Sequence, residues 1–277
     1  MQLFMAEKIN FDVEIPKLRS YAVELANLTL EILAQSKYEE YDHPMFMTTT
    51  FVCKQLSHLK SVITLADSEQ YKDAFSIARV MTEGYAILLW ANEEPAERPL
   101  DWRAYVLVDQ FKRSFGQPNY SEHQEYLETM LDRYCRKYLK NEYKTKLQRD
   151  IIPDNYLGTW RRDNDNDKNK FINITIEKVF EDVGLKEIHD SLYDPASGWL
   201  HWDSFSMAET IERKADGSIA FGDDPQYLGA IAIASAIHAL FGSASSLDKH
   251  LQLGFSGRLA DFLKRMTDGT KINAQHQ

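Results

Sequence analysis

The sequence predicts an all-α fold, a multi-helix bundle that carries one small β-hairpin near residues 211–221. Two observations favour helices over strands. Glycine and proline, which most often interrupt helices, are sparse, with 12 Gly and 8 Pro among 277 residues. Apolar side chains also recur every three or four residues over long stretches, which is the period of a helix with one buried face. Because hydrophobic residues make up 44% of the chain, enough for a large core, we expect residues 1–277 to form a single helical domain.

Three long helices are predicted in the first third of the chain. Residues 13–35 place their apolar side chains on one face. Asp42 followed by Pro44 is a typical helix start, an N-cap with a proline in the first turn, and this second helix continues to about residue 66. The third helix covers about residues 70–92 and is apolar on nearly every side, as internal helices are.

The middle of the chain is more polar. Pro99 begins a fourth helix after the break EEPAERP. The capping-box pattern of Ser121 and Gln124 begins a long helix that ends near residue 148. Residues 151–170 have the polar centre RRDNDNDKNK and are predicted to form a mobile loop or a subdomain boundary.

Short elements follow this loop. Helices are predicted at residues 175–183 and 185–193. Asp194 and Pro195 are expected to cap and begin a new helix through the sequence ASGWLHWDS. The segment IERKADGSIAFG alternates around an Asp-Gly pair, which predicts the hairpin.

Two helices end the chain, at residues 225–251 and 256–266, and residues 268–277 are predicted to be a frayed tail. Residues 225–247 contain no Asp, Glu, Lys or Arg and are long enough to cross a membrane. They are rich in small residues and contain His238, so we interpret them as a close-packed central helix and expect no membrane partner.

Charge and cysteine content indicate a compartment. The net charge of −10 disfavours overall attraction to nucleic acid or anionic lipid. The first residues, MQLFMAEKINFD, lack the basic region and apolar run of a signal peptide. Cys53 and Cys135 are too few for a disulfide framework. We therefore expect a cytoplasmic protein.

Arg79 and Glu83 are the only charged residues in the stretch AFSIARVMTEGYAILLWAN. They lie four residues apart and so share a face of the third helix. An unpaired buried charge costs several kcal/mol, so the pair needs a partner on another element. One interpretation is a buried polar network that fixes helix packing. The other is a catalytic site in which Arg79 binds an anion and Glu83 orients it or acts as a base.

Tyr193, Ser197 and His201 lie four residues apart in the sequence YDPASGWLHWDS. If Asp194 caps a new helix, Ser197 and His201 share one face of it. An imidazole there suits proton transfer near neutral pH, so His201 is a candidate catalytic residue and Tyr193 and Ser197 are candidate binding residues. The alternative is a core histidine with a structural role.

His238 is the only readily ionisable side chain in the middle of the apolar helix 225–247. It is a candidate binding residue that can meet Arg79 or Glu83 in the core. A histidine donating to a backbone or hydroxyl group is the structural alternative.

Residues 133–149 form a basic stripe in an otherwise acidic chain, with seven Lys or Arg against one Glu. Arg133, Arg136, Lys137 and Lys140 are its candidate binding residues. Interleaved tyrosines suit base stacking, so RNA or a nucleotide is the predicted partner. The alternative is a solvated helix face.

The sequence predicts no metal site and no cofactor. Asp163, Asp165 and Asp167 have the spacing of an EF-hand loop, but Lys168 stands where that loop needs glycine and Ile174 where it needs glutamate. The chain also contains no HExxH or CxxC motif.

The sequences ARVMTEGYAILLW and YDPASGWLHWDS resemble the bacterial domain-of-unknown-function family 5677. The resemblance covers about residues 45–250 and implies an all-helical fold without an established activity. Its helical Arg-x3-Glu and Ser-x3-His elements correspond to Arg79 with Glu83 and to Ser197 with His201. A more distant similarity is to HEPN-like helical proteins, which include RNases of defence systems, although their Arg-x4-6-His motif does not occur here.

Two functions remain open from the sequence. One is a defence- or stress-related nuclease or nucleotide-acting enzyme, with Arg79, Glu83 and His201 around one cleft. The other is a non-catalytic binding or scaffold protein that forms homo-oligomers through its helices and recognises a ligand or protein partner.

Overall fold

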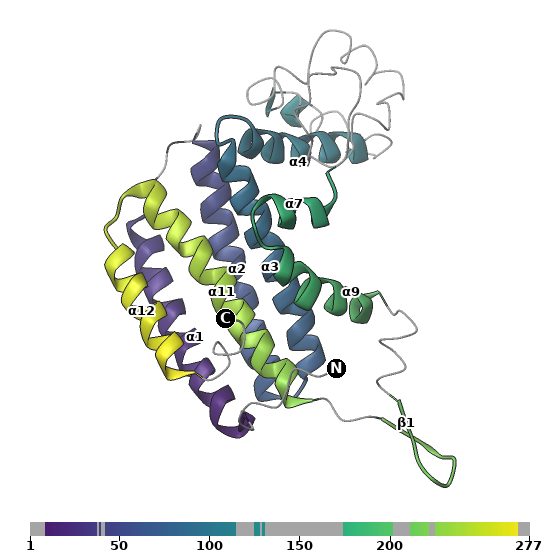
Figure 1. Ribbon diagram of the computed structural model, residues 1–277. Helices are drawn as coiled ribbons and strands as arrows, with labels where there is room; N and C mark the ends of the chain where they lie inside the picture. The colour runs from purple at the N-terminus through teal and green to yellow at the C-terminus, as the bar shows by residue number, and fades with distance from the viewer. Residues whose placement is uncertain are drawn as a thin grey trace.

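A computed structural model gives the architecture (Figure 1). It describes the following residues: 9–37, 39, 42–114, 125–127, 129–130, 174–201, 211–221 and 225–270. These residues form helices, together with one two-stranded hairpin. The predicted all-α class and the predicted hairpin are therefore confirmed.

Five long helices form the main bundle: α1 (Phe11–Gln35), α2 (His43–Asp67), α3 (Tyr71–Glu93), α11 (Gln226–Leu251) and α12 (Ser256–Gly269). Helix α11 is central, because it packs against α1, α2, α3 and α12. The largest apolar core of the described residues draws side chains from all five helices. Of the helices the structure describes, α11 alone is long and apolar enough to cross a membrane, and its place in this core accounts for the same composition.

The starts of α1 and α2 follow local sequence signals. The Asn10 side chain accepts a hydrogen bond from the Asp12 amide at 3.1 Å, and the Asp42 side chain accepts one from the Met45 amide at 3.0 Å. Such caps satisfy amides that have no partner inside the helix. The predicted N-cap Asp42 and first-turn Pro44 are thus confirmed.

Helices α3 and α11 run parallel and approach each other closely through two glycines. Gly229, near the start of α11, faces Tyr71 at the start of α3, and Gly242 faces Tyr85 further along. A Cβ atom on either glycine would lie 2.2 Å from the tyrosine ring. Only glycine leaves room for the rings at this distance.

Because α3 and α11 are parallel, the chain between them must return along the bundle. We call this connection, residues 94–225, the crossover. Its described helices are α4 (Arg98–Ser114), α7 (Ile176–Asp182), α8 (Lys186–Ile188), the π-helix η2 (His189–Tyr193) and α9 (Asp194–Leu200). Figure 1 shows α7 and α9 beside α3, on the opposite side of the bundle from α12.

The hairpin also belongs to the crossover. Strands β1 (Ile211–Arg213) and β2 (Ile219–Phe221) pair antiparallel, with Glu212 opposite Ala220. Gly217 adopts a left-handed φ of 83° in the turn, at the Asp-Gly pair that predicted it.

Two predicted boundaries need correction. Asp194 does not cap a new helix, because it has helical backbone angles and η2 continues directly into α9. The C-terminal tail begins later than predicted: α12 extends to Gly269, and Thr270 is buried with its hydroxyl donating to the Met266 carbonyl at 3.0 Å.

Other predicted segments fall on residues that the structure leaves undescribed. These are the loop 151–170, the basic stripe 133–149, the tail from residue 271 and most of the helix 121–148. Residues 125–127 and 129–130 of that helix are described and are helical.

Candidate functional site

Arg79 lies on the side of α3 that faces the crossover. Its side chain is 12% exposed, and all three guanidinium nitrogens contact a polar group. Nε donates to the Ser197 hydroxyl at 2.7 Å, and Nη2 donates to the Tyr193 hydroxyl at 2.6 Å. The guanidinium carbon also lies 4.1 Å from the centre of the Tyr193 ring. Arg79 therefore joins α3 to both η2 and α9.

Glu83 is the third partner, one helical turn after Arg79. Its carboxylate lies 3.4 Å from Nη1 of Arg79, and its side chain is 28% exposed. We call Arg79, Glu83, Tyr193 and Ser197 the Arg79 cluster. The charged guanidinium is thus neutralised by one partly exposed carboxylate and held by two hydroxyl groups, as a buried charge requires.

The Ser197 hydroxyl has both of its roles filled. It accepts a hydrogen bond from Arg79 and donates one to the Tyr193 carbonyl at 2.8 Å. A nucleophilic serine needs its proton directed at a base, whereas this proton is directed at a backbone carbonyl. Ser197 is therefore a positioning residue, which holds the Arg79 side chain in place.

The sequence of the crossover explains why Tyr193 and Ser197 reach Arg79. Leu192 and Ala196 are buried in the main core and draw this part of the chain onto the bundle. Tyr193 and Ser197 each follow one of these residues and are four apart, so they lie on adjoining turns of one face. The wider π-turn of η2, an element often found at functional sites, ends at Tyr193.

Four further contacts of this region were missed by sequence reasoning. The ring of His189 stacks on Tyr193 with 5.1 Å between centroids, and its Nδ1 lies 2.9 Å from the Asp190 carboxylate. At the other end of the segment, Trp199 donates to Asp73 at 3.4 Å. Lys72 lies over the Trp199 ring at 5.1 Å. The spacing of His189, four residues before Tyr193, was the available signal.

The two predicted histidine partners lie elsewhere. His201 is exposed directly after α9, and its amide donates to the Ser197 carbonyl at 2.9 Å. His238 packs edge-on against Tyr85 at 5.6 Å between ring centroids. In the described part of the chain, no hydrogen bond or ion pair joins either histidine to Arg79 or Glu83. The partners of Arg79 are instead the hydroxyl groups predicted as binding residues.

The environments of His238 and Tyr85 shift their protonation. His238 is exposed on one side, but desolvation by the helices on its other side lowers its pKa below the usual value. Burial raises the pKa of the Tyr85 phenol. Both shifts favour the neutral forms at this contact between α3 and α11.

The remaining predicted binding residues, Arg133, Arg136, Lys137 and Lys140, lie outside the described residues. Among the described residues, no group of three or more His, Cys, Asp or Glu side chains is placed to hold a metal ion.

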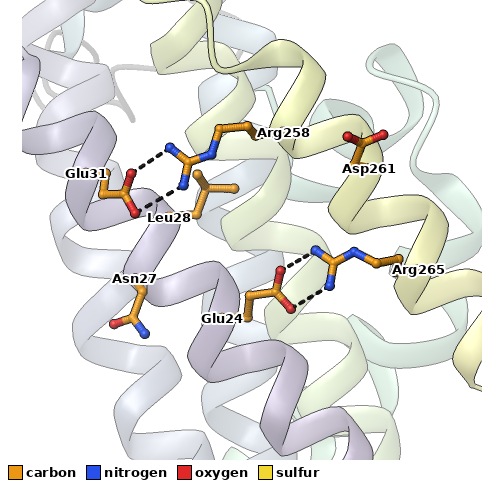
Figure 2. A pocket seen from close by; sticks show the side chains of 7 residues that line it. All are labelled: Glu24, Asn27, Leu28, Glu31, Arg258, Asp261 and Arg265. Carbon is orange, nitrogen blue, oxygen red and sulfur yellow. Dashed lines mark hydrogen bonds and ion pairs between the residues drawn. The ribbon is translucent and has the colours of Figure 1, made fainter.

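A groove lies on the outer surface between α1 and α12 (Figure 2). Two Arg–Glu pairs cross it, Arg258 with Glu31 and Arg265 with Glu24. Its other lining residues are Asn27, Leu28 and Asp261. Because each of the two arginines is already paired with a carboxylate, the groove holds its charges in intramolecular contacts.

Comparison with known proteins gives one match. The family model described as "Family of unknown function (DUF5677)" matches residues 45–219. No curated protein and no solved structure matches. The matched residues include α2 from Met45, α3 and the crossover as far as Ile219, the first residue of β2, and therefore the whole Arg79 cluster.

Proposed function

Since the chain belongs to the DUF5677 family, whose function is unknown, we propose that the crossover carries the function and recognises a ligand or protein partner. In this proposal the protein is a helical binding or scaffold protein. The bundle is the rigid support, and α3 connects it to the recognition segment. Binding residues are commonly placed on connections that a rigid scaffold positions.

The observation that carries this proposal is the engagement of Arg79 by three partners from its own chain. Its guanidinium fastens η2 and α9 to α3, so an external anion would have to displace Tyr193 or Ser197. A buried arginine used in this way positions the segment that it holds.

A second, smaller core supports the crossover as a unit of its own. Trp90 and Ala86 of α3 pack with residues of the crossover, namely Ile174, Val179, Phe180 and Tyr193. Arg98 extends the attachment beyond this core, because it stacks on Trp90 at 3.8 Å and pairs with Glu94 at 2.7 Å. The family model matches this supported segment and ends before α11 and α12.

The test is capture of partners by full-length protein, followed by titration of each purified partner. Arg79→Met is compared with wild type and with Arg265→Met, which removes an arginine from the opposite side of the bundle. We expect Arg79→Met to weaken binding at least about tenfold, which corresponds to about 1.4 kcal/mol, and the control to bind as wild type does. Equal binding by all three proteins would contradict a role for the crossover.

The second candidate function is a nuclease or nucleotide-acting enzyme in bacterial defence or stress response. The observation in its favour is the position of His201, one turn after Ser197 and exposed to solvent. Glu83 is also partly exposed, and the basic stripe 133–149 belongs to the same crossover. In this proposal Glu83 and His201 transfer protons, while Arg79 holds the segment.

The two candidates differ in what single substitutions do. Wild type, Glu83→Gln and His201→Ala are incubated with labelled single-stranded RNA and with ATP, and their melting temperatures are measured in parallel. The enzyme proposal predicts cleavage or hydrolysis by wild type and at least about a hundredfold loss in His201→Ala at unchanged stability. Unchanged rates in both variants would refute it and leave the binding proposal.

We also propose a cytoplasmic location, which the two cysteines, too few for a disulfide framework, support. Fractionation of cells that produce the tagged full-length protein tests it, and recovery in the membrane fraction after a salt wash would contradict it.

A further inference from the structure

The outer face of α1 carries an uninterrupted line of uncharged, exposed residues. We call it the α1 stripe, and its members are Val13, Pro16, Ser20, Val23, Asn27, Leu30 and Ala34. Three of them are large apolar side chains with high exposure: Val13 at 46%, Val23 at 49% and Leu30 at 54%. Scattered exposed apolar residues are ordinary, but these three lie along one line of one helix.

The α1 stripe has the spacing of a coiled-coil seam. Its residues are separated alternately by three and four positions over three heptads. The opposite face of α1 holds Leu18, Leu25 and Ile32, which are buried in the main core. A surface helix normally places its charged residues opposite the core, whereas α1 places them beside the stripe. The helix therefore has two seams, one used by the bundle and one facing outward.

We propose that the α1 stripe pairs two copies of this chain in a parallel, two-fold symmetric dimer. The uncharged seam runs from Val13 to Ala34, a length of about 33 Å. Val13, Ser20 and Asn27 occupy the heptad positions called a, and Val23 and Leu30 occupy positions called d. An asparagine at a single a position, here Asn27, fixes the register of parallel dimers by pairing with its copy.

The charges beside the stripe complement each other in this arrangement. Arg19 and Glu24 hold the flanking g and e positions, five residues apart, where the two chains of a parallel pair meet. Within one chain Arg19 contacts Asp67 at 3.0 Å and Glu24 contacts Arg265, both in partly exposed pairs of the kind that contribute little stability. Two-fold symmetry brings Arg19 of each copy to Glu24 of the other copy, where the two side chains share or replace these contacts. An antiparallel pair that aligns the full stripe would instead place the two Glu24 residues against each other. Charge complementarity thus selects a second copy in parallel orientation.

The groove between α1 and α12 holds one edge of the stripe in place. Arg258 contacts both carboxylate oxygens of Glu31, at 2.6 and 3.1 Å, and Arg265 pairs with Glu24 (Figure 2). The hydrogen bond from Arg258 lowers the pKa of Glu31, so the Glu31 carboxylate stays ionised at this edge of the stripe. Side chains that are already ordered lose less entropy on association.

This inference specifies the homo-oligomer of the proposed scaffold function, and it does not depend on what the crossover recognises. Sedimentation velocity of full-length protein, from about 1 to 100 µM, measures the dimer directly. We expect a concentration-dependent dimer in wild type and at least about a tenfold higher dissociation constant in Val23→Lys/Leu30→Lys. Wild type that remains monomeric throughout this range would overturn the proposal.

A matched control separates the stripe from general surface hydrophobicity. Ile219 in the hairpin is 72% exposed, so Ile219→Lys adds the same charge at an exposed apolar site outside α1. It should dimerise as wild type does, and so should Arg79→Met, which alters the crossover. Circular dichroism melts check that all variants fold. A dimer weakened equally by Ile219→Lys would place the interface elsewhere and overturn the proposal.

Disulfide trapping tests the orientation. In a Cys53→Ser/Cys135→Ser background, Val13→Cys should crosslink to itself, because position 13 meets its copy in a parallel pair. A mixture of Val13→Cys and Ala34→Cys proteins should not form the mixed disulfide. Crosslinking of the mixture without self-crosslinking of Val13→Cys would show an antiparallel pair and overturn the parallel one.

Discussion

Helix α3 is held on its two sides by different kinds of contact. Toward α11, two tyrosine rings lie over two glycines, and shape decides the fit. Toward the crossover, Arg79 binds two hydroxyl groups and one carboxylate. The tyrosine–glycine contacts cannot be loosened without moving a whole helix, because packed interiors leave no free space. The hydrogen bonds of Arg79, in contrast, can be replaced one at a time by hydrogen bonds to water. The bundle is therefore expected to be the rigid part and the crossover the adjustable part.

The largest effect should come from closing the space between α3 and α11. Gly229→Ala places a Cβ 2.2 Å from the ring of Tyr71, which is 6% exposed and cannot swing aside. Overpacking of this kind destabilises by about 1–3 kcal/mol. Urea unfolding followed by circular dichroism measures the loss.

Gly257→Ala is the matched control for this substitution. Gly257 lies in the first turn of α12 with no atom within 4 Å of the added Cβ, so alanine should stabilise by up to about 1 kcal/mol through helix propensity. Equal destabilisation by both substitutions would refute shape as the basis of the α3–α11 contact.

The next effect should be local to the crossover. Arg79→Met removes the hydrogen bonds to Tyr193 and Ser197 and leaves Glu83 without its partner, which weakens the attachment of residues 189–201 by about 2 kcal/mol. Hydrogen exchange followed by mass spectrometry should show faster exchange in residues 189–201 and little change in α11. Faster exchange in both segments to the same extent would mean that the two sides of α3 are not separable.

The smallest effect should be the pH dependence that His238 contributes on the α3–α11 side. The folded-state pKa of His238 is lowered, so the unfolded chain binds a proton first as the pH falls through the ordinary histidine value. The stability that neutral His238 maintains is thus present above about pH 6.5 and decreases below it, until the folded form is also protonated. His238→Gln should reduce the slope of unfolding free energy against pH between about 5 and 7. An unchanged slope would mean that the pH dependence comes from His43 or His58, whose pKa values burial also lowers.

The sequence predicted the bundle well where the evidence lay within a single helix. Apolar periodicity located α1, α2, α3 and α11 to within about two residues, because a helix with a buried face must repeat that face. The contacts of Gly229 with Tyr71 and of Gly242 with Tyr85 were not predicted. Nothing in the spacing of small residues shows which rings of a distant helix lie over them.

On the crossover side, the sequence identified Arg79 as a charge that needs a partner from another helix, and it selected Tyr193 and Ser197 as binding residues. It did not show that Tyr193 and Ser197 are the partners that Arg79 needs. The prediction assumed a fresh helix capped by Asp194, whereas a π-turn leads into α9 and that helix ends at Leu200. His201 is the exposed C-cap of α9, one turn after Ser197, and its side chain makes no hydrogen bond to Arg79 in the described part of the chain. A wider turn changes the phase of every following residue, and its position cannot be read from apolar periodicity.

The parallel pairing of α3 and α11 also determines the order in which the chain can fold during synthesis. Helices α1, α2 and α3 emerge first, and all of residues 94–225 must be made before α11 is available to fill the centre between them. At ribosomal rates of about 5–20 residues per second, this interval lasts on the order of 10 s. During that time the faces of α2 and α3 that α11 will cover remain unpaired, and native contacts across so long a loop form slowly. A chain ending at residue 219, where the family match ends, would stay in that state.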